Sequence, residues 1–201
     1  PHIATKYIDF IKENTPWKII FYGHDLHFLR LQREYELEQR PELLEEIQYF
    51  KNMEFSVMGK AEMSYYPSSL EVEEIHKIDD SIPVKAITAY VFDKPVAVEK
   101  IGEEREGILF VGGFAHPPNE DAVLWFCEEV LPFMKRQLPD LKFRIVGSHV
   151  TDKVKDLEKI KGVEVLGFVS DERLHELYQE SRLVIVPLRY GAGVKGKVVE
   201  A

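Results

Sequence analysis

The chain has 201 residues, which is enough for one or two domains with buried cores. Hydrophobic residues make up 45% of it and charged residues 30%, and its 12 glycines and 11 prolines are scattered, so the composition excludes disordered and collagen-like sequence. The 26 Lys and Arg against 35 Asp and Glu give a net charge of −9, the wrong sign for a protein that coats nucleic acid or an anionic membrane. Any anionic ligand therefore needs a local basic site.

Short apolar runs alternate with helical patterns along the whole chain, which predicts an α/β fold with parallel sheets. In the first half, the patterns predict helices over His2–Asn14, from Pro41 to about Lys60, and over Ser68–Ile78. Ser68 with Glu71, or Ser69 with Glu73, is available to cap the last of these. Strands are predicted over Trp17–Tyr22, which is apolar enough to be buried, Met63–Tyr66 and Val84–Tyr90, and a polar turn over Gly23–His27.

Residues 93–106 are charged, are broken by Pro95 and Gly102, and predict a linker between a first domain over residues 1–92 and a second over 107–201. In the second domain we predict strands over Gly107–Val111, Leu141–Val146, Val163–Leu166 and Leu183–Val186, and helices over Pro118–Gln137, Asp152–Lys159 and Asp171–Glu180. Residues 197–201 resemble the first turn of a helix with no stop signal, and residue 1 is Pro. We therefore expect both ends to be cut.

The segment after the last predicted strand is the most informative. Its sequence, RYGAGVKGKVVEA over residues 189–201, puts three glycines and two lysines where a strand enters a helix, a place at which backbone N–H groups can face an anion. Lys195 and Lys197 would add point charges for a diphosphate, and Glu200 could accept hydrogen bonds from ribose hydroxyls. Arg189 and Gly193 complete this set of donor-site candidates. The alternative is a solvated loop with ordinary surface lysines.

Two further turns follow predicted strands. Gly112 and Gly113 could present backbone to the same ligand, although a tight turn with Asn119 as the N-cap of the next helix is the simpler interpretation. His24 and Asp25 follow the early strand, where a histidine beside a carboxylate can move a proton or bind a sugar hydroxyl. His24 and His27 lack further ligands at a diagnostic spacing, so we predict no metal site.

Several familiar sites are absent from the sequence. It has no Walker A pattern, no G-x-S-x-G, no H-E-x-x-H and no full G-x-G-x-x-G, which disfavours P-loop phosphoryl transfer, covalent hydrolysis and ordinary nicotinamide binding. Cys127 is alone and lies in an apolar helical pattern, so we expect it to serve packing in a reducing compartment such as the cytoplasm. No apolar stretch approaches the ~20 residues that cross a bilayer.

These residues together resemble the two-Rossmann-domain (GT-B) glycosyltransferases of family 4, the glycosyl transferases group 1. The segments ILFVGGFAHPPNEDAVLWF, LKFRIVGS and VEVLGFVSDERLHELYQESRLVIVPLRYGAGVKGKVVEA are similar, in order and spacing, to the opening part of that family's donor-binding domain. IIFYGHDLHFLR, MSYYPSS and VKAITAY resemble the later half of the acceptor-side domain. The resemblance implies two Rossmann-like domains, both incomplete in this chain.

The resemblance also implies an activity. It is the transfer of a sugar, with retained anomeric configuration, from a nucleotide-diphosphate donor to a carbohydrate or lipid-linked acceptor during polysaccharide or glycoconjugate synthesis, with no cofactor and no required metal. On this chain, Gly112 and Gly113 match the glycine loop near the diphosphate, Lys195 and Lys197 the phosphate-binding segment, and His24 the acceptor-side histidine. Glu200 matches the second glutamate of the family's E-x7-E motif. We expect a cytoplasmic location, which includes the inner face of the membrane. The resemblance leaves open whether the full-length protein makes peripheral contact with the membrane.

The sequence departs from the family pattern at two places. Ala192 stands where the first glutamate of E-x7-E belongs, and Phe114 and His116 replace an arginine that many relatives carry after the first donor-domain strand. Because both domains are incomplete, we expect this chain alone to be inactive. A nucleotide-sugar epimerase or hydrolase on the same scaffold, or a degenerate nucleotide-sugar-binding module, remains as an alternative.

Overall fold

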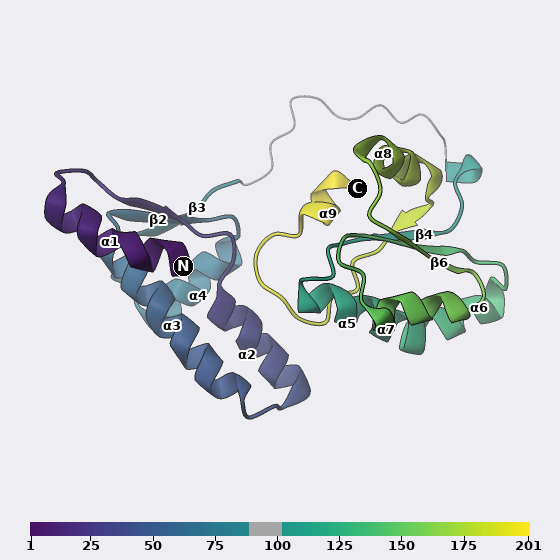
Figure 1. Cartoon of the computed structure of the whole chain (residues 1–201), viewed down its shortest axis with the longest axis horizontal. Coiled ribbons are helices and arrows are strands. Elements are labelled where there is room, and N and C mark those ends of the chain that lie inside the picture. Colours follow the sequence, from purple (N-terminus) through teal and green to yellow (C-terminus); the bar gives the residue numbers. More distant parts are fainter. Residues whose placement is uncertain (89–101) are drawn as a thin grey trace. The chain divides into compact units, whose positions relative to one another are not determined.

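The computed structural model of the chain describes residues 1–88 and 102–201 (Figure 1). These residues form two compact units, one with residues 1–88 and Tyr190–Val194, the other with residues 102–189 and Lys195–Ala201. Each unit contains one parallel sheet with helices packed on it, which confirms the predicted α/β class. Residues 93–101 of the predicted linker, and residues 89 and 90 of the predicted third strand, lie outside the described residues.

The first unit is built around a parallel sheet of order β1-β2-β3. Its elements are α1 (His2–Asn14), β1 (Ile20–Tyr22), α2 (His27–Glu38), α3 (Leu43–Lys60), β2 (Met63–Tyr66), α4 (Ser69–Ile78) and β3 (Val84–Ala86). Leu26, Met58, Tyr66 and Ile75 are almost completely buried in its core, together with Val84 of β3. The α2–α3 pair packs side by side, so the core lies between these helices, α4 and the sheet.

Two expectations for the first unit were wrong or incomplete. The strand predicted over Trp17–Tyr22 starts only at Ile20 and is not buried, because β1 is an edge strand of the described sheet: Trp17 is 71% exposed and Ile20 66%. Helix α2 was not predicted at all. Its buried apolar residues, Phe28, Leu29 and Leu31, gather in the first half of a strongly charged sequence, so contacts with α3 rather than a regular apolar stripe stabilise it.

The second unit is a four-stranded parallel sheet of order β6-β5-β4-β7. Its elements are η1 (Gly102–Glu104), β4 (Ile108–Val111), α5 (Pro117–Trp125), η2 (Phe126–Val130), α6 (Leu131–Gln137), β5 (Phe143–Val146), α7 (Asp152–Lys155), η3 (Asp156–Lys159), β6 (Val163–Gly167), α8 (Asp171–Glu180), β7 (Leu183–Val184) and α9 (Gly196–Glu200). Every strand predicted in this half is present, with ends that differ by a few residues. The helix predicted over Asp152–Lys159 is an α-helix only to Lys155 and continues as the 3-10 helix η3.

Helices cover both faces of this sheet, as is usual for a parallel sheet. Ile108 and Phe110 of β4 pack against α5, η2 and α6 on one face, while Leu109 packs against Leu177 of α8 on the other. Figure 1 shows α5, α6 and α7 on one side of the sheet and α8 on the opposite side. Cys127 lies in the first of these cores, where burial raises the pKa of its thiol to about 12. The residue serves packing there, as expected.

The helix predicted over Pro118–Gln137 is not regular throughout. Between α5 and α6 the chain makes one wide π-helical turn, η2, in which the N–H of Leu131 donates to the carbonyl of Phe126. Pro132 follows immediately. Proline has no N–H and its ring collides with the carbonyl four residues earlier, so the wider turn lets the helix pass this position without breaking.

The strand order creates a switch point beside β4. From β4 the chain adds β5 and β6 on one side, and then returns to place β7 on the other side. The loops that follow β4 and β7 therefore leave the sheet in opposite directions at its carboxyl edge. Ligands of open parallel sheets bind in the crevice that this produces.

We predict that Leu109→Ala lowers the free energy of unfolding of the second unit by about 2–5 kcal/mol, because Leu109 is completely buried between β4 and α8. Urea unfolding, followed by fluorescence in a Trp17→Phe background so that Trp125 reports on this unit alone, measures the loss. Ile3→Ala, at a position that is 75% exposed, is the control and should stay within about 0.5 kcal/mol of the parent. Equal effects of the two substitutions would contradict the core assignment.

Candidate functional site

The loops after β4 and β5 approach each other closely at the carboxyl edge of the second sheet. The N–H of Gly112 donates to the carbonyl of Val146 at 2.9 Å, and the N–H of Phe114 donates to the carbonyl of Ser148 at 2.8 Å. A Cβ atom on Gly147 would lie 1.9 Å from the Gly112 carbonyl oxygen, which no real side chain can do. Gly147 is therefore required for the two loops to meet.

Lys197 reaches this glycine turn from the far end of the chain. Its Nζ atom donates to Oδ1 of Asn119 at 2.7 Å and lies 4.4 Å from the centroid of the Phe110 ring. A Cβ atom on Gly112 would be 2.7 Å from the same Nζ and 2.9 Å from Cγ of Asn119, so a side chain there would force Lys197 and Asn119 to shift. The structure thus brings together Gly112 and Lys197, which are 85 residues apart in the sequence.

The ammonium group of Lys197 is half-buried, and this burial lowers its pKa to about 8. The neighbouring positive charge of Lys195 lowers the pKa further, whereas Glu200 raises it. The aromatic face of Phe110 offers the cation an attractive but weak contact. Because burial makes the charged form of Lys197 unfavourable, an anion that binds beside it would stabilise the ammonium group.

Asn119 does not cap α5, contrary to the simpler interpretation of the glycine turn. His116 occupies the N-cap position without a side-chain cap bond, and Pro117 and Pro118 begin the helix, where a proline needs no N–H partner. Asn119 lies inside the first turn and is 6% exposed. Its Nδ2 donates to the carbonyl of Gly113 at 2.8 Å, while its Oδ1 accepts from Lys197.

A pocket of about 190 Å³ lies between the ends of β4, β5 and β6 and the start of α8. Gly112 and Gly113 form one wall of it. The other lining residues were not among the sequence candidates; they include Gly147, Ser148, Phe168 and Asp171. The Gly-Ser that follows the apolar run FRIV has the same strand-then-glycine pattern as Gly112 and Gly113, so the sequence carried a signal for this second wall.

Arg189, Lys195 and Glu200 take other positions in the second unit. The guanidinium of Arg189 forms a forked ion pair with Asp121 on α5, with its Nε atom 2.9 Å from Oδ2. Lys195 is the N-cap residue of α9. Glu200 is exposed and accepts a hydrogen bond of 3.4 Å from the hydroxyl of Tyr178, whose pKa burial and this carboxylate raise to about 12.

His24 and Asp25 follow β1 in the first unit. The exposed His24 ring packs edge-on against Tyr22 at a centroid distance of 5.3 Å, and the carboxylate of Asp25 lies 3.8 Å from both Arg30 and His27. Gly193 belongs to this unit: a Cβ atom on it would be 2.9 Å from the His24 carbonyl oxygen, and its φ of +71° favours glycine. Gly193, a donor-site candidate in the sequence, thus lies in the first unit beside His24 and Asp25.

Two side chains of the first unit hold the segment Tyr190–Val194. Arg33 donates to the carbonyl of Gly191 at 2.6 Å, and Oε1 of Glu71 accepts from the N–H groups of Gly193, at 3.1 Å, and Leu26, at 2.7 Å. Glu71 is 2% exposed. The capping predicted for α4 was wrong, because its N-cap Ser68 makes no side-chain cap bond and Glu71 serves these two backbone groups.

Ala192 is 8% exposed in the same segment. This is the position at which the family pattern expects the first glutamate of E-x7-E. The small side chain is enclosed in the first unit, so a glutamate here would have to displace its surroundings or turn outward. The departure at Ala192 is therefore built into the local packing.

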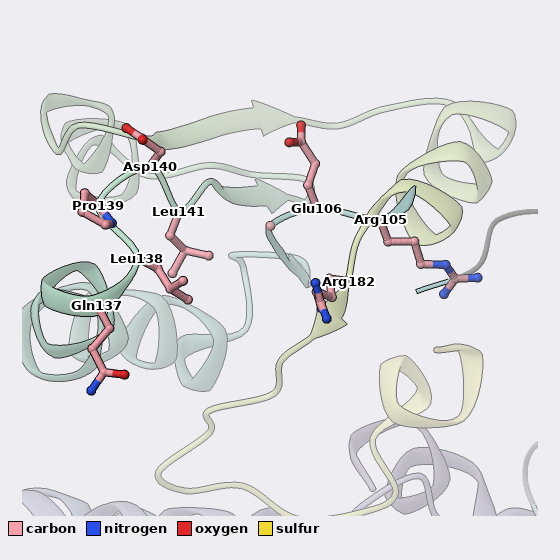
Figure 2. A pocket seen from close by; sticks show the side chains of 9 residues that line it. Arg105, Glu106, Gln137, Leu138, Pro139, Asp140, Leu141 and Arg182 are labelled. Atoms are coloured by element: carbon pink, nitrogen blue, oxygen red, sulfur yellow. The ribbon is translucent and has the colours of Figure 1, made fainter. Parts of the chain in front are cut away.

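A larger pocket of about 370 Å³ lies at the opposite edge of the second sheet (Figure 2). The residues that line it, among them Glu106, Leu141 and Arg182, stand just before β4, β5 and β7 in the chain. It therefore opens at the amino ends of the strands, away from the glycine turns. None of the predicted site residues lines it.

Within residues 1–88 and 102–201, no group of three or more His, Cys, Asp and Glu side chains is placed to hold a metal ion. No helix in the described part of the chain has the length and apolar character to cross a bilayer.

Comparison with known proteins agrees with this geometry. Residues 105–201 match the family described as Glycosyl transferases group 1. An uncharacterized 44.6 kDa protein in the cps region of Klebsiella pneumoniae is 28% identical over 113 residues, which is 53% of this chain and 29% of that protein. The residues that match this family include the glycine turns and Lys197 described above.

Solved structures show the same fold. A mutant of TarM from S. aureus, in complex with Fondaparinux, alpha-GlcNAc-glycerol and UDP, superposes with a TM-score of 0.57 at 12% identity over 86% of this chain and 33% of its own. A UDP-forming α,α-trehalose-phosphate synthase from Burkholderia xenovorans gives 0.53 at 12% identity over 93% of this chain and 57% of its own. The two units are Rossmann-like units of GT-B type, and the chain spans less than two thirds of each of these proteins.

We predict that Gly147→Ala disrupts the contact between the β4 and β5 loops, because the new methyl group would overlap the Gly112 carbonyl. Overpacking of this kind costs about 1–3 kcal/mol. Chemical denaturation measures the loss, and Gly59→Ala, where a Cβ atom has ordinary clearance, is the control. A Gly147→Ala variant as stable as the parent would show that the loops can separate without cost.

We also predict that Lys197 makes stability rise with pH between about 8 and its ordinary pKa of about 10.4. In that window the unfolded chain binds more protons at this residue than the folded chain, so the free energy of unfolding increases with pH. Urea unfolding of the parent and of Lys197→Gln at a series of pH values measures the difference. The variant should lose this rise, whereas Lys161→Gln, at an exposed lysine, should keep it.

Proposed function

We propose that the chain is part of a retaining glycosyltransferase that moves a sugar from a nucleoside-diphosphate donor to an acceptor hydroxyl in polysaccharide or glycoconjugate synthesis. The observation that carries the proposal is the meeting of the Gly112–Gly113 turn with Lys197 at the switch point of the second sheet. This is where a parallel sheet binds a nucleotide, and the site offers both backbone and a cation to a diphosphate.

In this proposal the second unit holds the donor. Lys197 and Lys195 bind the diphosphate and stabilise the negative charge that develops on it as the sugar leaves. The glycine turn lets the phosphates approach the backbone, because Gly112 and Gly113 carry no side chains, and a side chain at Gly112 would push against Lys197. Glu200, exposed on α9, is placed in the first turns after the lysines and binds the donor ribose. No cofactor is needed for this chemistry.

The first unit contributes the acceptor side. His24 is exposed at the end of β1, so a hydroxyl group can reach its imidazole, while the carboxylate of the following Asp25 lies beside His27 and Arg30. The Klebsiella relative is described as a protein of the cps region, and the S. aureus structure contains UDP and a GlcNAc-glycerol. Both descriptions support a nucleotide-sugar donor and a carbohydrate acceptor for this chain.

A nucleotide-sugar-binding module without transfer is the second candidate. The enclosed Ala192 favours it, because the glutamate that the family pattern places there is absent. Analysis of the products separates this module from a transferase and from the hydrolase alternative. A transferase forms a glycoside, a hydrolase releases free sugar, and a binding module forms neither.

The test is calorimetry on the full-length protein with UDP, GDP, ADP and CMP and with their sugar conjugates, with and without EDTA. We expect selective binding of one nucleoside diphosphate that EDTA does not change. Removal of one charged hydrogen bond costs about 1.5–3 kcal/mol, so Lys197→Ala should weaken this binding by about tenfold or more. Lys161→Ala, far from the site in the sequence and exposed, should bind like the parent. A protein that binds none of the nucleotides would contradict the proposal.

A further inference from the structure

We propose that Asn119 is a positioning residue for the anion site: it fixes the ammonium group of Lys197 against the Gly112–Gly113 turn and keeps that ammonium charged without neutralising it. The identity of the anion as a diphosphate rests on the proposed function. The hold of Asn119 on Lys197 does not, because it follows from contacts within the second unit.

The two contacts of Asn119 have opposite polarity. Lys197 can only donate, and the carbonyl of Gly113 can only accept, so the amide must turn Oδ1 to the first and Nδ2 to the second. Both distances are short, at 2.7 and 2.8 Å. The side chain is buried, and its backbone N–H is also held, by the His116 carbonyl at 3.0 Å. Asparagine therefore locks the lysine and the turn in one arrangement.

The charges around Lys197 show why an amide is suited to this position. At its own helix, Lys195 disfavours the positive charge of Lys197 and Glu200 favours it. Phe110 of β4 offers the ammonium group an aromatic face, and Asn119 of α5 offers it a neutral oxygen. Tyr178 of α8 donates to Glu200. An ammonium group has three donors, of which Asn119 accepts one. A neutral acceptor thus leaves the full positive charge for an incoming anion.

A carboxylate at the same position would act differently. Asn119→Asp keeps an acceptor for Lys197 but pairs it with a negative charge, which raises the pKa of the lysine and repels a diphosphate. It also turns an oxygen towards the Gly113 carbonyl in place of a donor. Asn119→Leu removes the acceptor altogether, which lowers the pKa of the buried ammonium further. The two variants should therefore weaken anion binding while moving the pKa of Lys197 in opposite directions.

The experiment measures both properties on the full-length protein. NMR titration of the lysine Cε resonances, with Lys197 assigned by its loss in Lys197→Arg, gives the midpoint for this group. Calorimetry with inorganic pyrophosphate and with UDP gives the affinities over the same pH range. In the parent, affinity should fall as the pH rises through about 8. We expect about tenfold weaker binding near neutral pH in both variants, with a higher midpoint in Asn119→Asp and a lower one in Asn119→Leu.

The matched control is Asn52→Asp, which makes the same change at an exposed asparagine of α3 and should alter neither property. If Asn119→Leu fails to fold, Asn119→Ser is measured in its place, because its smaller side chain also removes the amide and fits the same buried position. Midpoints that move in the same direction, or do not move, in the Asp and Leu variants would overturn the proposal. If the parent binds neither probe but the midpoints still move in opposite directions, the positioning role of Asn119 stands and the donor function fails.

Discussion

The candidate site depends on one steric constraint, the close approach of the loops that follow β4 and β5. The Gly112 carbonyl occupies the space that a side chain at Gly147 would need, and the two loops are joined there by backbone hydrogen bonds. This approach leaves the glycine turn open on its other side, where Lys197 enters, and it forms one wall of the small pocket beside α8. Backbone, rather than side chains, thus lines the part of the site nearest to the sheet, which suits a ligand that is itself rich in acceptors.

Electrostatics gives the same site a second property. The chain as a whole is acidic, so long-range attraction does not bring anions to it. The positive charge of Lys197 is instead placed locally, and its partial burial makes it more responsive to an anion than a lysine in bulk solvent would be. In the proposed function, selectivity for an anionic group therefore rests on a few fixed contacts and not on the overall field of the protein.

Much of the fold could be predicted from the sequence, because the strands of the second unit are short runs rich in apolar, β-branched and aromatic residues that alternate with helical patterns. α8, for instance, begins and ends at the predicted residues Asp171 and Glu180. The failures have physical causes. α2 lacks an apolar stripe, β1 is apolar but lies at a sheet edge, and the π-helical turn before Pro132 leaves no trace in a helical period.

The candidate site was predictable in its residue types but not in its pairing. Glycines and lysines after strands indicate an anion site, yet nothing in the sequence shows that Lys197 meets Asn119, or that Gly193 lies against His24. Such pairs are set by strand order and by which loops meet at the edge of the sheet. Asn119 in particular looked like a helix cap, since local sequence favours that role for asparagine after a turn. In the structure, α5 starts earlier, at Pro117 and Pro118, so Asn119 lies within the first turn and its side chain contacts Lys197 and Gly113 instead.

The assignment of Tyr190–Val194 to the first unit bears on how this protein can be dissected. The chain leaves the second unit at residue 189, contributes five residues to the first, and returns at Lys195. No single cut in the backbone can therefore separate the two units cleanly. An isolated piece beginning at residue 102 would keep this segment without Arg33 and Glu71, the side chains that satisfy its backbone, and would expose the buried Tyr190 and Ala192 to water. Expression of the second unit by itself is thus better designed with a short polar bridge in place of these five residues than as a simple truncation.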